Sequence, residues 1–329
     1  MSMTAVVIRT AGGPEVLKLE RLPIPTVKSE HVLIRIKAFG LNRSDLFIRQ
    51  GHSLGVTSVA FPRVLGIEAV GVIESAPGLE DRFPPGAKVA TAMGGMGRAF
   101  DGGYAEYTSV PAKQVQVLDT TLPWEVLGAL PEMLQTAWGS LMKALELEEG
   151  DRLLIRGGTT SVGLTAAAIA KNKGAFVAST TRKVEREALL KENGADEVWI
   201  EDGDIAGQLE KSAHEKFDKV LELVGTITLK DSLRCVKKGG IVCLTGVVGN
   251  EWTMERINPM QLIPSQTKLT IYGGSDANFM TTPLPDLIKQ VEENRLKIKV
   301  GRVFHMEQIV EAHQCMEDNA AGGKVVVLV

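Results

Sequence analysis

A glycine-rich turn between an apolar run and an alanine-rich run carries the clearest chemistry of this chain of 329 residues. The apolar run at 152–156 leads into two adjacent glycines, and a third glycine precedes the alanine-rich stretch that ends near 171. A strand, a tight turn and a helix in this order present unpaired backbone N–H groups to a pyrophosphate. The spacing follows G-x-G-x-x-G except at its middle glycine. We therefore predict a dinucleotide site whose turn residues bind the cofactor: Gly158, Thr160, Ser161, Val162 and Gly163.

Two other interpretations of this turn exist. A nucleoside-triphosphate loop is excluded because Leu164 stands where its phosphate-binding lysine must be. The other is that the glycines only make a compact turn; the β-α units that follow favour the dinucleotide site.

The end of the next predicted strand indicates which dinucleotide fits. An NAD site usually places a carboxylate there, whereas a 2′-phosphate requires its absence and an added cation. Here small hydroxyl side chains are followed by Arg182 and Arg186. Alternatively, these cations only solvate a helix start, and Glu185 and Glu187 weaken the case for a phosphate site. The sequence favours NADPH, bound at this end by Ser179, Thr181, Arg182 and Arg186.

Charge and composition indicate a small-molecule partner. The chain has 37 Lys and Arg against 40 Asp and Glu, 44% apolar residues and a formal net charge of −3. Nucleic acids and anionic membranes demand clustered basic residues, which this balance does not suggest. Three widely spaced cysteines argue against a disulfide framework. With no secretory signal and no run of about 18 apolar residues, we expect a soluble, cytoplasmic protein.

The elements that position the turn fall into two regions. The first ~125 residues contain short β-branched runs between turn residues, which suggests a partly open barrel or sandwich. Apolar residues then recur at helical spacing from Trp124 to Leu147, and strands and helices alternate after Gly150. This alternation predicts an α/β fold with a doubly wound parallel sheet. Its expected strands are 152–157, 175–180, 197–200, 218–223 and 240–246, and its expected helices are 161–173, 184–193, 204–213 and 226–237.

The last part of the chain predicts further elements. A strand at 269–273 extends the sheet or pairs with another subunit. Beyond it we expect a helix at 285–294, a strand at 302–305, a helix at 306–318 and a final strand at 324–329.

Several motifs together resemble the medium-chain dehydrogenase/reductase superfamily, in its zinc-independent, quinone oxidoreductase-like branch. They are GLNRSD at 40–45, IRQG at 48–51, PRVLGIEAVG at 62–71, GGYAEY at 102–107, the glycine turn, and GGKVV at 322–326. The resemblance implies a GroES-like catalytic domain of residues 1–125 and 268–329 and a Rossmann NADP-binding domain of residues 126–267, with cofactor and substrate between them. It also implies a homodimer.

The resemblance implies chemistry without a metal. Zinc-dependent relatives carry a Cys and a His in segments where this chain has Asn42 and Ile67, and no cysteine occurs before Cys235. Without a Lewis acid to polarise an alcohol or ketone, the expected reaction is hydride transfer from NADPH to a quinone or an α,β-unsaturated carbonyl. The alternative is an NADPH-binding protein with a structural or regulatory role and little turnover.

The resemblance also assigns catalytic positions. Asn42 would donate a hydrogen bond to a substrate oxygen, Asp45 would hold that amide or a water, and His52 is a candidate proton donor. The alternatives are helix capping for Asn42 and Asp45 and simple exposure for His52. Well-studied quinone reductases have tyrosines where this chain has Phe47 and about Ser53, which weakens any transfer of substrate preference.

More cofactor contacts follow from the resemblance, and the sequence leaves open whether Lys324 reaches the site or flanks an edge strand. The expected contacts are Thr136, Gly225, Gly246, Val247, Gly274 and Ser275.

Overall fold

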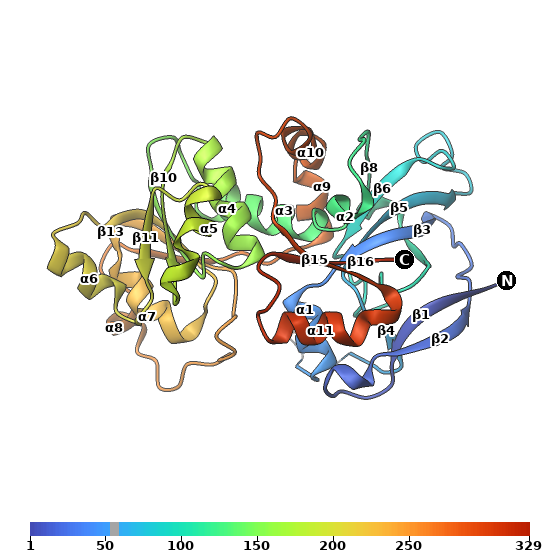
Figure 1. The fold of residues 1–329 in the computed structure, drawn as a ribbon, viewed down its shortest axis with the longest axis horizontal. Coiled ribbons are helices and arrows are strands. Elements are labelled where there is room, and N and C mark those ends of the chain that lie inside the picture. The colour runs from blue at the N-terminus through green and yellow to red at the C-terminus, as the bar shows by residue number, and fades with distance from the viewer. Residues whose placement is uncertain (53–58) are drawn as a thin grey trace. The chain divides into compact units, whose positions relative to one another are not determined.

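The computed structural model describes residues 1–52 and 59–329, and they divide into two compact units (Figure 1). Unit 1 comprises residues 1–135, 274–293 and 300–329, and unit 2 comprises residues 136–273 and 294–299. The C-terminal part of the chain thus returns largely to unit 1.

The boundaries of the units differ from those predicted at 125 and 268. Residues up to 135 stay with unit 1, where the Glu132 amide donates to Glu68 at 2.8 Å. Residues 294–299 join unit 2, where Lys297 donates to the carbonyl of Glu192 and the Arg295 carbonyl accepts from Asn172.

Unit 2 is built on a parallel six-stranded sheet with the order β11-β10-β9-β12-β13-β14. This is the doubly wound arrangement that the alternating pattern predicts. The order reverses between β9 and β12, and such a switch point is where these sheets bind ligands. The strands are β9 (Arg152–Arg156), β10 (Phe176–Thr181), β11 (Glu197–Ile200), β12 (Phe217–Glu222), β13 (Val236–Leu244) and β14 (Lys268–Ile271).

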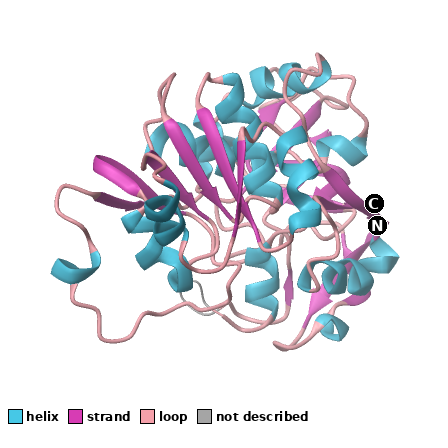
Figure 2. Cartoon of the chain, turned by 60° about the vertical axis from the view of Figure 1, so that its left-hand side comes forward, coloured by secondary structure: helices cyan, strands magenta, loops and turns pink. Residues whose placement is uncertain are grey.

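Helices lie on both sides of this sheet (Figure 2). Leu154, Ala178, Val220 and Val242 from four neighbouring strands join one apolar core, which explains why these strands are apolar runs rather than alternating ones. The helices of unit 2 are α4 (Ser161–Asn172), α5 (Glu187–Glu192), α6 (Ile205–Ser212), α7 (Thr226–Arg234) and α8 (Pro259–Leu262).

Two predictions about unit 2 need correction. The helix expected to reach 237 ends at Arg234, and the strand expected from 240 begins at Val236, because Val236 already pairs with Phe217 in the sheet. The strand expected at 269–273 is β14, and it pairs with β13 in parallel, as one of its two predicted roles requires.

The helical spacing from Trp124 to Leu147 predicts one helix, but the structure has three pieces. They are α2 (Trp124–Leu127), α3 (Pro131–Gly139) and a π-helical turn (Ser140–Ala144). Pro131 has no N–H to continue a helix from α2, so α3 starts there. At its other end Gly139 packs so closely on Tyr272 that a Cβ would lie 2.0 Å from the ring.

Unit 1 contains a seven-stranded sheet with the order β15-β16-β3-β5-β6-β8, in which β7 also pairs with β3. The final strand β16 pairs antiparallel with β3, which brings the C-terminal segment into this sheet. The strands are β3 (His31–Gly40), β5 (Glu68–Ser75), β6 (Lys88–Ala92), β7 (Tyr107–Pro111), β8 (Val115–Val117), β15 (Val300–His305) and β16 (Lys324–Leu328).

A smaller sheet and several helices complete unit 1 among the described residues. The smaller sheet has the order β2-β1-β4, and its apolar side chains share one core with the larger sheet. These elements are β1 (Ser2–Ile8), β2 (Lys18–Pro23), β4 (Arg63–Val64), α1 (Arg43–Arg49), α9 (Asp276–Thr281), α10 (Leu284–Glu292) and α11 (Ile309–Glu317).

Candidate functional site

The glycine turn of unit 2 joins β9 to α4 at the switch point of the sheet. Gly157 has φ +81°, a conformation that favours glycine. A Cβ on Gly158 would lie 2.9 Å from the Ser179 Cβ, and one on Gly163 would lie 2.6 Å from the Gly157 carbonyl oxygen. The glycines therefore let the turn pack directly on β10 and let α4 pack on the turn.

Thr160 occupies the middle position of the glycine pattern because it caps α4. Its φ of −71° needs no glycine, and its Oγ1 accepts from the Gly163 amide at 3.0 Å and donates to the Gly157 carbonyl at 2.8 Å. The amides of Ser161 and Val162 find no acceptor among the described residues. Two backbone donors at a helix N-terminus fit the pyrophosphate of a nicotinamide dinucleotide.

The end of β10 presents hydroxyl groups followed by two unpaired cations. Ser179 and Thr181 are buried, and the Ser179 Oγ has no hydrogen-bond partner. Arg182 is exposed and Arg186 is half-buried, and neither guanidinium forms an ion pair with any described residue. Glu187 does not neutralise Arg186, because its carboxylate pairs with Lys191 at 2.7 Å.

Other predicted contacts lie at the carboxyl ends of neighbouring strands. Gly225 follows β12 with φ +113°, and a Cβ there would lie 3.1 Å from the Val247 Cα. A Cβ on Gly246 would lie 2.5 Å from the Leu223 carbonyl oxygen. Thr136 lies in α3, within unit 2. The structure thus brings Gly225, Gly246 and Val247 together beside the switch point.

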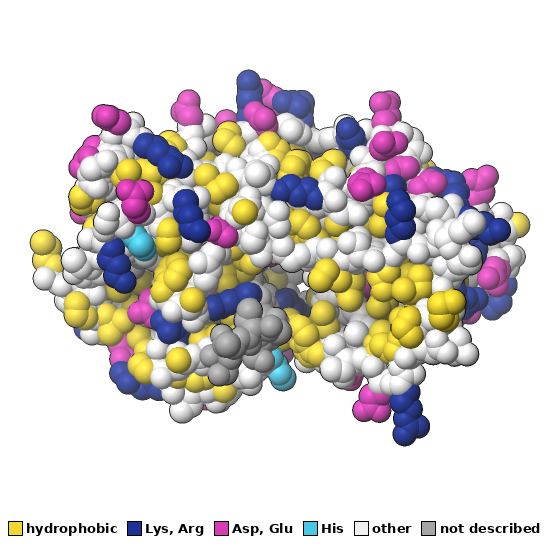
Figure 3. Space-filling model, turned by 180° about the vertical axis from the view of Figure 1, so that it is seen from behind, with side chains coloured by type: hydrophobic (Ala, Val, Ile, Leu, Met, Phe, Trp, Pro, Cys, Tyr) yellow, Lys and Arg dark blue, Asp and Glu magenta, His cyan; other side chains and the backbone are white. Residues whose placement is uncertain are grey.

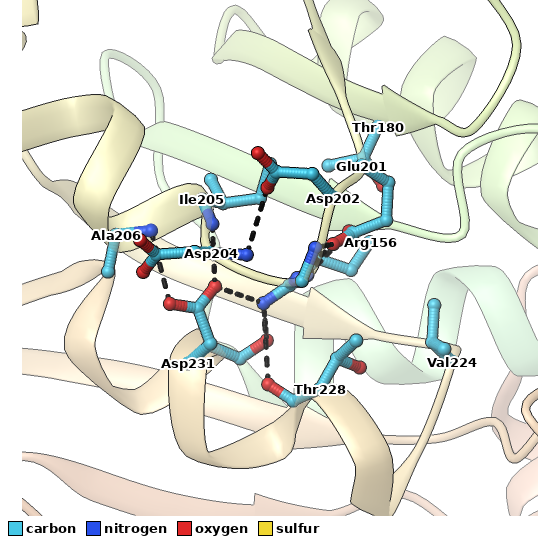
Figure 4. A network of polar contacts seen from close by, with 12 residues as sticks. Arg156, Thr180, Glu201, Asp202, Asp204, Ile205, Ala206, Val224, Thr228 and Asp231 are labelled. Atoms are coloured by element: carbon cyan, nitrogen blue, oxygen red, sulfur yellow. Dashed lines mark hydrogen bonds and ion pairs between the residues drawn. The ribbon is translucent and has the colours of Figure 1, made fainter.

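Arg156, which the sequence analysis did not single out, is fully buried at the end of β9, directly before the turn. Its Nε and Nη2 donate to Glu201, and its Nη1 donates to Asp231 at 2.6 Å (Figure 4). Asp231 also accepts from the amides of Ile205 and Ala206 at the start of α6. One guanidinium therefore ties β9, β11, α6 and α7 together beneath the glycine turn.

Unit 1 has its own buried polar cluster, formed by Asn42, Glu68 and Lys324. The Lys324 Nζ lies 2.9 Å from Glu68 Oε1 and donates to Asn42 Oδ1 at 2.6 Å. The Asn42 amide donates to Glu68 at 2.8 Å and to the Gly40 carbonyl at 3.4 Å. Gly40 leaves room for this cluster, since a Cβ there would lie 2.4 Å from Glu68 Oε1. Lys324 therefore reaches the cluster rather than merely flanking an edge strand.

This geometry bears on the predicted roles of Asn42 and Asp45. Both N–H groups of the Asn42 amide already have acceptors, so donation to a substrate oxygen would require one of them to be released. Asp45 does not hold that amide. Its Oδ2 instead accepts from the Asn42 backbone N–H at 3.3 Å, which caps α1. Donation by Asn42 to a substrate stays a prediction.

Asp45 is the titratable group of unit 1 with the most unusual surroundings. Its side chain is fully buried, and its Oδ1 has no hydrogen-bond partner. Burial raises the pKa of Asp45 to about 7, although the charge of Arg98 opposes this shift. Burial lowers the pKa of Lys324, whereas the neighbouring Glu68 and Glu132 carboxylates raise it. The carboxylates outweigh burial, so the pKa of Lys324 is raised above its ordinary value.

A buried aromatic contact lies beside Asp45. His313 lies 3.2 Å from the Tyr104 hydroxyl through Nε2 and 3.4 Å from the Arg49 guanidinium through Nδ1. Burial and the Arg49 charge lower the pKa of His313 to about 3, so its ring is neutral at physiological pH. Because Arg49 can only donate, Nδ1 is the acceptor and Nε2 carries the proton.

A cavity of about 530 Å³ lies in unit 1, and Ile67 lines it. Gly274 and Ser275, which the resemblance assigns to the cofactor, line this cavity as well. Ser275 also caps α9, because its Oγ accepts from the Asn278 amide at 3.0 Å. These two residues therefore belong to unit 1 and not to the glycine turn.

The remaining candidates lie apart from the polar cluster. His52 is exposed, and its ring meets Phe47 edge to face at 6.4 Å. Ser53 lies outside the described residues. Among those that are described, no three His, Cys, Asp or Glu side chains gather in a way that could hold a metal ion.

One face of the surface can be compared with the expectation from composition. Basic and acidic side chains are interspersed over the face in Figure 3, without a large patch of one sign. Within residues 1–52 and 59–329, none of the helices combines the length and apolar character that crossing a bilayer demands.

Comparison with known proteins places the chain in a family. Residues 28–120 match the alcohol dehydrogenase GroES-like domain, and residues 193–327 match the zinc-binding dehydrogenase family. A quinone oxidoreductase of Pongo abelii is 29% identical over 99% of this chain and 98% of its own. The chain is a quinone oxidoreductase-like medium-chain dehydrogenase/reductase. Similar proteins also include the NADPH-dependent alkenal/one oxidoreductase of Arabidopsis thaliana, 27% identical over 99% of this chain and 79% of its own.

A solved structure gives the same result. A mycobacterial protein complexed with NADPH superposes with a TM-score of 0.86 at 26% identity, covering 99% of this chain and all of that one. The medium-chain dehydrogenase/reductase fold, with its GroES-like and Rossmann domains, is confirmed. As a member of this superfamily the chain is an oxidoreductase.

Proposed function

We propose that this protein is a zinc-free, NADPH-dependent reductase of quinones or α,β-unsaturated carbonyls. The proposal rests on the residues that this chain has at the two positions where, by the resemblance, its relatives ligate zinc. Asn42 is committed to Glu68 and Lys324, and Ile67 is an apolar wall of the cavity. Neither can act as one of the Cys, His or carboxylate ligands that zinc requires.

The cofactor assignment rests on unit 2. The amides of Ser161 and Val162 would hold the pyrophosphate, and the close packing of Gly158 on β10 keeps a side chain out of its way. Arg182 and Arg186 would hold the 2′-phosphate, because they follow β10 and neither has a carboxylate partner among the described residues. Their unpaired charge supports NADPH over NADH.

When bound, the reduced nicotinamide supplies a hydride. Without a Lewis acid, the acceptor carbon must already be electron-poor, as in a quinone or an enone, where the developing negative charge is delocalised. The protein then contributes binding and orientation. The apolar walls of the cavity, Ile67, Met93 and Met96, would hold the carbon skeleton of the acceptor.

The buried cluster of unit 1 would keep that cavity in shape. Glu68 accepts from the Glu132 amide as well as from Asn42 and Lys324, so it joins β5, α1, β16 and α3.

Names of similar proteins add support, since they include a quinone oxidoreductase and an NADPH-dependent alkenal/one oxidoreductase.

The proposal is tested by mixing the purified protein with NADPH and either 9,10-phenanthrenequinone or a simple enone, and by following cofactor absorbance. Oxidation of NADPH that depends on protein and acceptor is the expected result. Cofactor binding without turnover across a broad panel of electron-poor acceptors would contradict it and favour the non-enzymatic, NADPH-binding alternative.

A further inference from the structure

Two arginines line the cavity of unit 1, and they carry an inference about the acceptor that rests on the proposed function. Arg63, at β4, and Arg98, in the loop after β6, share this cavity with apolar walls and with the glycines at 94 and 95. A neutral quinone or enone gives no reason for two guanidinium groups there.

Arg98 forms no hydrogen bond or ion pair with any residue that the structure describes. Its half-buried guanidinium donates to no described residue, and its Nε is shielded from water without an acceptor. A partly buried guanidinium without hydrogen-bond acceptors is unfavourable, so an acceptor from a ligand would improve its surroundings.

Only some of the N–H groups of Arg63 have hydrogen-bond acceptors among the described residues. Its Nη1 donates to Asp101 Oδ1 at 3.2 Å, whereas its Nε is buried without an acceptor. Its side chain is 17% exposed, while that of Asp101 is 58% exposed. An exposed carboxylate neutralises a neighbouring cation weakly, so Arg63 still adds positive potential to the cavity.

The carboxylates around the cavity do not remove this positive charge. Asp276, which lines the cavity, is held by Lys113 at 3.1 Å. Asp45 interacts with Arg98 only through its charge, without a hydrogen bond or an ion pair between them. The cavity therefore joins an apolar wall to a cationic end formed by Arg63 and Arg98.

We propose that Arg98, assisted by Arg63, binds a carboxylate group of the acceptor, so that the preferred substrates are enones or quinones that bear a carboxylate. A guanidinium matches the two oxygens of a carboxylate in geometry and charge. In an enone of this kind, hydride from NADPH adds to the β-carbon and a proton adds to the α-carbon. The C=C bond becomes a single bond, NADPH becomes NADP⁺, and the carboxylate is unchanged.

The test compares a charged acceptor, (E)-4-oxopent-2-enoate, with its neutral methyl ester in the wild type and in Arg98→Met. Loss of a charge-assisted hydrogen bond predicts a KM for the acid that is about 10- to 100-fold higher in R98M, with a much smaller change for the ester. R35M is the matched control, because Arg35 is an exposed arginine of the same unit paired with Glu74, and it should change neither KM.

A binding measurement separates this inference from the proposed function. Isothermal titration with 4-oxopentanoate, the saturated product, should show weaker binding to R98M than to wild type, whether or not the protein turns over. R63M, which should weaken binding less, serves as a second variant if R98M does not melt cooperatively. Equal losses for acid and ester, or unchanged binding of 4-oxopentanoate in both variants, would overturn the inference. Failure to reduce any acceptor would contradict the function alone.

Discussion

Each unit of this protein buries a cation among carboxylates, Arg156 in unit 2 and Lys324 in unit 1, and the surroundings of these two cations are completed to different degrees. In unit 2 all three guanidinium nitrogens of Arg156 donate to described residues, and its partner Asp231 also accepts two backbone N–H groups. In unit 1 Lys324 is equally well paired with Glu68, but nearby Asp45 keeps a buried oxygen without a partner.

The contrast separates two uses of buried charge. The completed cluster around Arg156 ties the ends of strands together next to the glycine turn. The incomplete one lies near the cavity that Arg98 lines, and it contains a carboxyl with a pKa near neutrality. Saturated buried charges hold a fold in place, whereas unsaturated ones indicate where a ligand or a proton can bind.

The largest expected effect comes from breaking the completed cluster. Arg156→Met removes the cation and leaves Glu201 and Asp231 without it, which should lower the free energy of unfolding by about 3–5 kcal/mol. Urea denaturation measures the change. R234M is the control, because Arg234 is 45% exposed in its ion pairs, and it should cost less than about 1 kcal/mol. Equal losses of stability in R156M and R234M would show that the buried network stabilises the fold no more than an exposed ion pair does.

Replacing Asp45 in unit 1 should raise the free energy of unfolding, whereas replacing Arg156 in unit 2 lowers it. The pKa of Asp45 is higher in the folded protein than its ordinary value of 3.8, so the folded state binds this proton more tightly and loses stability as the pH rises from about 4 to about 7. Asp45→Asn should therefore raise the free energy of unfolding at pH 8, by roughly 4 kcal/mol at most, and the gain should vanish below about pH 4.

The control for this pH dependence is D276N. The hydrogen bond from Lys113 lowers the pKa of Asp276, so its replacement should bring no gain at pH 8. A gain in D45N that is the same at pH 4 and pH 8 would rule out desolvation of the carboxylate as its cause.

The difference between paired and unpaired cations extends to cofactor choice. Unlike Arg156, Arg182 has no ion-pair partner among the described residues, so it is free to bind a 2′-phosphate. Arg182→Ala should weaken NADPH binding by about 10- to 100-fold and leave NADH binding nearly unchanged, as measured by titration of cofactor fluorescence. K183A, a neighbouring exposed cation, is the control. Equal loss of both cofactors would refute the assignment.

The smallest effect on chemistry is expected at the edge of the unit 2 sheet. Ile271 on the edge strand β14 is 72% exposed, and the predicted homodimer would form through this strand. Ile271→Asp should halve the mass measured by size exclusion with light scattering, to the 35.5 kDa of one chain. V303D, on the edge strand β15 of unit 1, should not. A wild-type monomer would contradict the dimer.

The sequence predicts the local elements of the cofactor turn well, because strand, turn and helix there each follow from a short pattern. Thr160 shows the limit of that pattern, since a side chain that caps α4 replaces a glycine. The break of one predicted helix at Pro131 could have been foreseen from the proline. The π-helical turn after Gly139 could not, because it accompanies a contact with Tyr272, which is distant in sequence.

The polar clusters are harder to predict, although one signal was present. Arg156, Glu68 and Lys324 each stand at one end of a largely apolar strand, and buried charges are rare unless paired. That pattern marks them as buried and paired, but it does not name their partners. Glu201 and Asp231 come to Arg156 from other parts of the chain, and only the assembled sheet brings them together.

The central claim, that reduction proceeds without a metal, is tested most directly by one measurement. Turnover of NADPH with 9,10-phenanthrenequinone is followed in protein of measured zinc content, before and after dialysis against a chelator. We predict turnover that is independent of zinc content, because Asn42 and Ile67 supply no ligands. Turnover that is lost with the chelator and restored by added zinc would contradict it.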